Sequence, residues 1–201
     1  MIITVVGTRA VEFEKRIMLR DVIRHIDSIV DDVLWRSGGA RGTDESVEVY
    51  GKHTEISLPY INFNGKQAGG AYYTIASTGL TTTAIRVASI VWANGDNFKW
   101  VNGDIVGVPI NRWHELSYVV KNLHSRNVFE VLGKKLDLKS DFLLCYAKPT
   151  MRGVKGGTDT AFRLAKSLKI PTLNLWTDGV AEAILKTKNL KELTALFRTG
   201  I

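Results

Sequence analysis

Three times along this chain a strand-like apolar run ends in a glycine-bearing loop, and a helical pattern follows. The clearest loop, 37–44, follows the apolar run 33–35 and precedes a helical segment at 45–51. The other two loops, Gly7-Thr8-Arg9 and 153–158, follow the runs 2–6 and 141–146. Alternating strands and helices predict an α/β, Rossmann-like fold: a mostly parallel sheet with helices on both faces. Loops that follow parallel strands should meet at one rim of the sheet.

Hydrophobic periodicity places the remaining elements. Further strands are expected at 54–58 and 171–176. Apolar residues recur at three and four positions in the segments expected to be helical, namely 13–30, 113–132, 159–168 and 180–197.

The chain of 201 residues is expected to form a single domain, because no linker, low-complexity tract or charge block divides it. The pattern weakens at about 60–111, where turn signals interrupt short apolar runs. We interpret this part as an insertion at one edge of the sheet.

The glycine loops suit the binding of a phosphate group. Gly38, Gly39 and Gly42 allow positive φ angles and a close approach of a ligand to the backbone. Thr43 or Asp44 could cap the next helix, whose unpaired N–H groups and positive dipole end favour an anion. The alternative is a glycine-rich turn with no ligand.

The charge is unevenly distributed. The net charge is +7, and after residue 111 Lys and Arg outnumber Asp and Glu by 16 to 8. A basic half favours polyanionic partners such as nucleotides or single-stranded nucleic acid. No apolar run is long enough to span a bilayer, so no membrane partner is expected. The single cysteine, Cys145, excludes an intramolecular disulfide and favours a cytoplasmic location.

Four motifs together resemble the SLOG superfamily of Rossmann-like domains, and within it the proteins similar to DNA-processing protein A, a DNA recombination mediator. The motifs are Gly7-Thr8-Arg9, 39–44, Ser125-Arg126-Asn127 and Gly156-Gly157-Thr158. The resemblance implies a pocket at the strand ends for a nucleotide, a nucleotide derivative or single-stranded DNA. The ligand-binding residues it implies are Gly7, Thr8, Arg9, Gly38, Gly39, Ala40, Arg41, Gly42, Thr43, Asp44, Arg126, Asn127, Lys155, Gly156, Gly157 and Thr158.

The superfamily also contains phosphoribohydrolases with a Pro-Gly-Gly-x-Gly-Thr-x-x-Glu loop, whose Glu is catalytic. Here the loop at 155–161 lacks the proline, the extra glycine and the Glu. The candidate acids or bases for an enzyme acting on an N-glycosidic bond are Asp44, Asp141 and Asp159. Helix capping by Asp44 and Asp159 and a structural role for Asp141 are the alternatives.

Three hypotheses follow: a noncatalytic binder of nucleotides or single-stranded nucleic acid, an enzyme acting at an N-glycosidic bond, and a protein-interaction module with a vestigial pocket. We favour the binder. No metal or cofactor is expected, because the histidines are scattered without metal-ligand spacing. A homo-oligomer, a dimer or larger, is expected through the apolar helix at 113–132.

Overall fold

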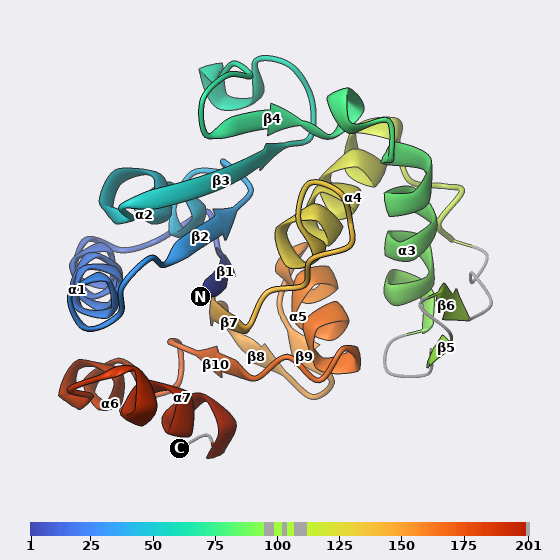
Figure 1. Cartoon of the computed structure of the whole chain (residues 1–201). Coiled ribbons are helices and arrows are strands. Elements are labelled where there is room, and N and C mark those ends of the chain that lie inside the picture. The colour runs from blue at the N-terminus through green and yellow to red at the C-terminus, as the bar shows by residue number, and fades with distance from the viewer. Residues whose placement is uncertain (95–98, 102–103, 107–111, 200–201) are drawn as a thin grey trace.

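The computed structural model describes residues 1–94, 99–101, 104–106 and 112–199, and its centre is a six-stranded sheet (Figure 1). The strand order is β10-β7-β1-β2-β3-β4, and every neighbouring pair is parallel. The bounds are β1 (Ile2–Gly7), β2 (Leu34–Ser37), β3 (His53–Leu58), β4 (Tyr72–Thr74), β7 (Phe142–Tyr146) and β10 (Thr172–Asn174). The predicted α/β, Rossmann-like fold with a parallel sheet is confirmed.

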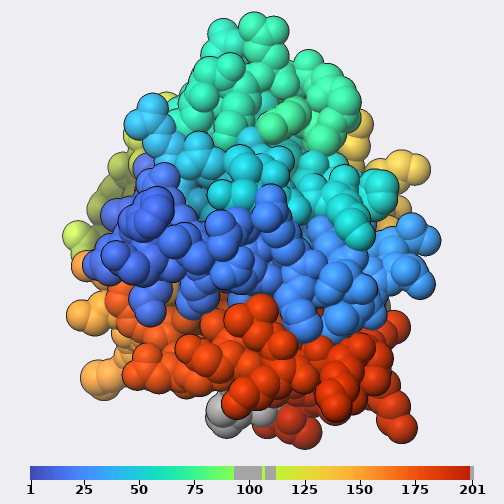
Figure 2. Space-filling model, turned by 90° about the vertical axis from the view of Figure 1, so that its left-hand side faces the viewer, coloured from blue at the N-terminus to red at the C-terminus, as the bar shows by residue number. Residues whose placement is uncertain are grey.

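Helices cover both faces of the sheet (Figure 1). One layer contains α1 (Phe13–Ile29), α2 (Thr43–Tyr50), α6 (Val180–Lys186) and α7 (Leu190–Thr199). The other contains α3 (Thr81–Asn94), α4 (Tyr118–Leu132) and α5 (Thr158–Ser167). Figure 2 looks onto the first layer, where α1 lies beside the C-terminal helices, coloured red. The apolar core is therefore divided into two clusters, one on each side of the sheet.

Several short elements lie around the main sheet and its helices. Two 3-10 helices, η1 (Phe63–Gly65) and η2 (Ile75–Thr78), flank β4. Two antiparallel ribbons lie outside the main sheet: β5 (Lys99–Val101) with β6 (Asp104–Val106), and β8 (Pro149–Thr150) with β9 (Gly153–Val154). The β8–β9 hairpin connects β7 to α5.

The helix α4 begins later than the sequence pattern predicts, at Tyr118 instead of residue 113. The Ser117 side chain caps it by accepting a hydrogen bond from the Val120 amide at 3.3 Å. Trp113 is buried outside the helix, with its ring centroid 5.9 Å from that of Trp92. Trp113 is therefore apolar because it packs in the core, not because it belongs to the helix. The Ser117 cap sets the start of α4.

The segment predicted to be helical at 180–197 forms two helices, α6 and α7. Asn189 starts the second helix by accepting a hydrogen bond from the Glu192 amide at 3.0 Å. The Thr187 amide donates to the Ile184 carbonyl at 3.0 Å, which closes the last turn of α6. Local side-chain capping here interrupts a continuous apolar periodicity.

The described residues of the segment 60–111 include one edge strand of the sheet and one helix of its second layer. These are β4, paired in parallel with β3, and α3, which packs beside α4 and α5. Residues 95–98, 102–103 and 107–111 of the predicted insertion lie outside the described part of the chain.

Helix α4 is enclosed by α3, α5 and the sheet. Every residue from Ser125 to Leu132 is buried, although Ser125, Arg126, Asn127 and Glu130 are polar. The exposed large apolar residues of this helix, Tyr118 and Val119, lie in its first turn. Its apolar surface is therefore mostly used within the chain, and its buried polar residues need partners there.

Candidate functional site

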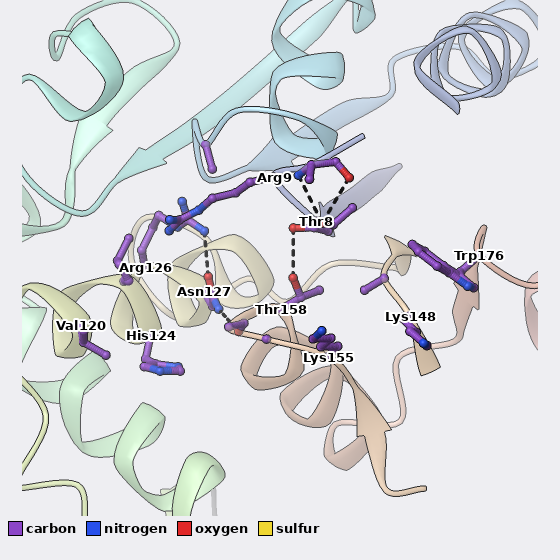
Figure 3. Close-up of a pocket in the computed structure, with 17 residues that line it drawn as sticks. Thr8, Arg9, Val120, His124, Arg126, Asn127, Lys148, Lys155, Thr158 and Trp176 are labelled. Atoms are coloured by element: carbon purple, nitrogen blue, oxygen red, sulfur yellow. Dashed lines mark hydrogen bonds between the residues drawn. The ribbon is translucent and has the colours of Figure 1, made fainter. Parts of the chain in front are cut away.

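A cavity of about 700 Å³ lies at the carboxyl ends of β1 and β7, between those strand ends and helices α4 and α5 (Figure 3). Its volume falls within the range that small-molecule sites occupy, roughly 300–1,000 Å³. The lining residues are Gly7, Thr8, Arg9, Ala10, Ala40, Val120, Leu123, His124, Arg126, Asn127, Ala147, Lys148, Lys155, Gly156, Gly157, Thr158 and Trp176.

The N-terminus of α5 supplies backbone donors to the cavity. The Asp159 and Thr160 amides donate to the carbonyls of Gly156 and Gly157, both at 3.2 Å, as the first turn forms. Among the described residues, the amides of Gly156, Gly157 and Thr158 have no hydrogen-bond acceptor. A Cβ at Gly156 or Gly157 would meet nothing within 4 Å, so the space beside these amides is open. Unpaired amides at a helix N-terminus favour an anion.

Side chains from two other elements fix this loop in place. Asn127 of α4 donates from Nδ2 to the Gly157 carbonyl at 2.6 Å. Thr158 donates from its hydroxyl to the Gly7 carbonyl at 3.1 Å, which ties α5 to the end of β1 (Figure 3). The orientation of the open amides is therefore set by contacts with α4 and β1.

Besides Arg126, three basic side chains line the cavity: Arg9, Lys148 and Lys155. All three residues are exposed, and within the described ranges none of them forms an ion pair with a carboxylate. They come from the ends of β1 and β7 and from the start of α5. Their positive charge adds to the dipole of α5 at the same end of the sheet.

Arg126 is different, because its charge is neutralised inside the protein. Its Nε lies 3.0 Å from Glu130 Oε1, and its Nη1 lies 3.6 Å from Asp44 Oδ2. Nη1 also donates to the Gly38 carbonyl at 2.8 Å, and Nη2 donates to Asn127 Oδ1 at 3.1 Å. The guanidinium therefore positions Asn127 and the 37–44 loop through its two Nη atoms.

Two buried carboxyl groups share this one guanidinium. Burial raises the pKa of Glu130 to about 8, although Arg126 acts in the opposite direction and the Asp44 charge adds to the increase. Burial also raises the pKa of Asp44, again opposed by Arg126. Two like charges in a site of low dielectric disfavour full ionisation of both groups. Burial therefore favours the protonated form of Glu130, and Arg126 opposes this shift.

His124 lines the other side of the cavity as a neutral imidazole. Burial, together with the nearby Arg126 cation, lowers the pKa of His124 to about 4. Its Nδ1 lies 2.8 Å from Thr160 Oγ1, and its ring lies 5.8 Å from that of Trp113. This wall of the cavity, which also contains Val120 and Leu123, is therefore uncharged near pH 7.

Ten of the residues predicted to bind the ligand line the cavity. They are Gly7, Thr8, Arg9, Ala40, Arg126, Asn127, Lys155, Gly156, Gly157 and Thr158. The other six, Gly38, Gly39, Arg41, Gly42, Thr43 and Asp44, are not among the lining residues.

The loop at 37–44 supports the β1 loop instead of forming the wall of the cavity. The Thr43 amide and hydroxyl both donate to the Thr8 carbonyl at 3.1 Å. The Gly39 carbonyl accepts from Lys66 Nζ at 2.8 Å and therefore faces η1 and β3. Arg41 is exposed. Of the 37–44 loop, Ala40 lines the cavity.

The three candidate catalytic carboxylates have structural partners, and none lines the cavity. Asp44 belongs to the buried cluster around Arg126. Asp141 accepts from the Ile2 amide at 2.8 Å at the opposite end of β1. Asp159 accepts from the Val154 amide at 2.9 Å and forms an ion pair with Arg163.

Sequence reasoning did not assign ligand-facing roles to Trp176, Lys148 or His124. Trp176 and Lys148 closely follow β10 and β7, so the rule that placed the glycine loops at the carboxyl ends could have found them. His124 had no such signal, because its position depends on how α4 packs against α5.

Comparison with protein-family models, with curated proteins and with solved structures finds no match for this chain. In the described part of the chain, no group of His, Cys, Asp and Glu side chains could hold a metal ion. None of the helices described here has the length and apolar character to cross a membrane.

Proposed function

We propose that this protein binds a phosphate-bearing ligand, a nucleotide or a segment of single-stranded nucleic acid, in the cavity at the carboxyl ends of β1 and β7. The observation that carries the proposal is the set of acceptor-free amides at Gly156, Gly157 and Thr158, three residues that line the cavity. Arg9, Lys148 and Lys155 line the same cavity and add positive charge. Backbone donors at a helix N-terminus with flanking cations form a typical phosphate site.

Between the two ligand classes, the geometry favours a nucleotide unit. The cavity of about 700 Å³ has room for one such unit. Lys134 and Lys135, which could have extended a basic track for a longer strand, follow the C-terminal end of α4. That end lies near the start of β7, away from the cavity, and Lys134 is over the Tyr73 ring. A strand bound in the cavity would not reach them directly.

A binding function without catalysis is favoured because the three candidate carboxylates are engaged in the fold. On this proposal the likeness to the SLOG superfamily lies in the strand-end phosphate site. A homo-oligomer remains a prediction. The exposed Tyr118 and Val119 at the start of α4 are its candidate contacts, and light scattering over a concentration series would test it.

The experiment compares binding of adenosine 5′-monophosphate and of a short single-stranded oligonucleotide by calorimetry. Gly157→Ala and Gly157→Val should weaken binding in that order, because each side chain fills the space beside the amides. Gly157 has a φ of −62°, so neither change strains the backbone. Ala76→Val, at an exposed position in η2, is the control for adding methyl groups elsewhere.

Salt dependence and product analysis separate the remaining alternatives. Oligonucleotide binding that falls steeply with salt indicates several phosphate contacts, whereas a shallow dependence indicates one anion site. Release of a free base would support the N-glycosidic enzyme. Unchanged binding of both probes by Gly157→Val would refute the proposed site.

A further inference from the structure

Trp176 presents a half-exposed indole ring to the cavity. It is 41% exposed and lines the cavity just after β10. Its ring centroid lies 5.1 Å from that of Tyr146, with 31° between the ring planes. Tyr146 is only 5% exposed, so it forms a fixed support behind the indole. One side of the indole is therefore packed, while the residue still borders the cavity.

The backbone at Trp176 is held rigidly by one side chain. Asn174 Oδ1 accepts from the Trp176 amide at 3.1 Å and from the Ala147 amide at 3.3 Å. Asn174 Nδ2 donates to the Ala147 carbonyl at 2.8 Å. The ends of β7 and β10 are thus joined by a single amide group. An aromatic ring on such a support loses little conformational entropy when a ligand stacks on it.

The opposite wall offers no comparable surface. Val120 and Leu123 are aliphatic, and the His124 ring is packed against Trp113 and Trp92 at 5.8 and 6.4 Å. Figure 3 shows Trp176 at one side and Val120 and His124 at the other, with Thr158 and Lys155 between them. The anion donors therefore lie between the two walls.

We propose that Trp176 is the residue on which the aromatic base of the ligand stacks, while its phosphate meets the amides of Gly156, Gly157 and Thr158. The site then selects a nucleoside phosphate over a sugar phosphate. This inference rests on the proposed function, because it assumes that the cavity binds a phosphate-bearing ligand. Lys148, which closely follows β7 and lines the same cavity, adds positive charge to the site.

The test compares two probes that share a ribose and a phosphate: adenosine 5′-monophosphate and ribose 5-phosphate. Stacking of a base on an aromatic ring corresponds to roughly a 5- to 150-fold change in affinity. Trp176→Ala should therefore weaken the binding of adenosine 5′-monophosphate by that factor and leave the binding of ribose 5-phosphate unchanged. Trp176→Phe keeps a stacking ring and should recover most of the lost affinity.

Tyr60→Ala is a matched control. Tyr60 is 40% exposed and packs on the buried Phe63 with ring centroids 5.3 Å apart, but it does not line the cavity. This variant should bind both probes like the unmodified protein. In addition, adenosine 5′-monophosphate should quench tryptophan fluorescence in the unmodified protein and quench it less in Trp176→Phe.

The possible failures are distinguishable. If Trp176→Ala binds adenosine 5′-monophosphate normally while Gly157→Val does not, the stacking role is refuted and the phosphate site stands. Equal weakening of both probes by Trp176→Ala would also refute it, because that result indicates a general effect on the shape of the site. If the unmodified protein binds neither of these probes nor the oligonucleotide, both proposals are wrong.

Discussion

Gly42 lies where the 37–44 loop packs against the backbone of the β1 loop. It precedes α2 and has φ 81° and ψ −118°, a conformation that side chains disfavour. A Cβ there would lie 2.5 Å from the Arg9 carbonyl oxygen and 2.6 Å from that of Thr8. Both neighbours are backbone atoms, so rotation of a side chain cannot relieve the overlap. Gly42→Ala must therefore move the loop that carries Thr8 and Arg9.

The expected loss of stability has two parts. The unfavourable backbone conformation costs about 1–3 kcal/mol for a residue with a Cβ. Overpacking against fixed atoms adds about 1–3 kcal/mol. The free energy of unfolding should thus fall by about 2–6 kcal/mol. With a urea m-value of about 2 kcal/mol/M, the midpoint should fall by roughly 1–3 M.

Gly179→Ala is the matched control. Gly179 also precedes a helix, α6, and has a φ of 83°, but a Cβ there would meet nothing within 4 Å. Gly179 has a ψ of −15°, in the left-handed region, so Gly179→Ala should lose only the cost of that conformation, about 1–2 kcal/mol. Urea unfolding followed by circular dichroism measures both variants, and Gly42→Ala should also weaken phosphate binding. Equal destabilisation by the two changes, with binding intact in both, would refute the close packing of the two loops.

Three further predictions follow from the buried titratable groups. Burial holds the pKa of Glu130 near 8, so the folded state binds an extra proton between the ordinary pKa of a Glu and pH 8. Stability should fall by more than about 1 kcal/mol from pH 5 to pH 8 in urea unfolding, and Glu130→Gln should flatten that slope. The pKa of His124 is lowered to about 4. The stability that its neutral, buried imidazole contributes is therefore lost as the pH falls from 6.5 towards 4. Its imidazole signal in NMR should titrate near pH 4, and a midpoint above 6 would contradict its burial. Burial raises the pKa of the Cys145 thiol to about 12, so a thiol reagent should label the protein in urea but not the folded protein.

Local patterns in the sequence were sufficient for the fold class and for five of the six strands of the main sheet, but not for β4 or α3. The β-branched run that became β1 is buried along its centre, as a central parallel strand requires. The spacing of apolar residues at three and four positions placed α1 within one residue of its observed end. Boundaries were missed where a single side chain decided them, as Ser117 does for α4 and Asn189 does for α7.

The role of each glycine loop was decided by tertiary structure. The sequence determined that three such loops follow strands and must meet at one rim, because parallel strands share their direction. It could not determine that the 37–44 loop supports Thr8 while Gly156 and Gly157 remain open to the cavity. Nor could it show that Arg126 is neutralised, since Asp44 reaches it only once α2 and α4 have packed across the sheet. Contacts between residues far apart in the chain depend on how the helices and strands pack, and local sequence patterns do not predict that packing.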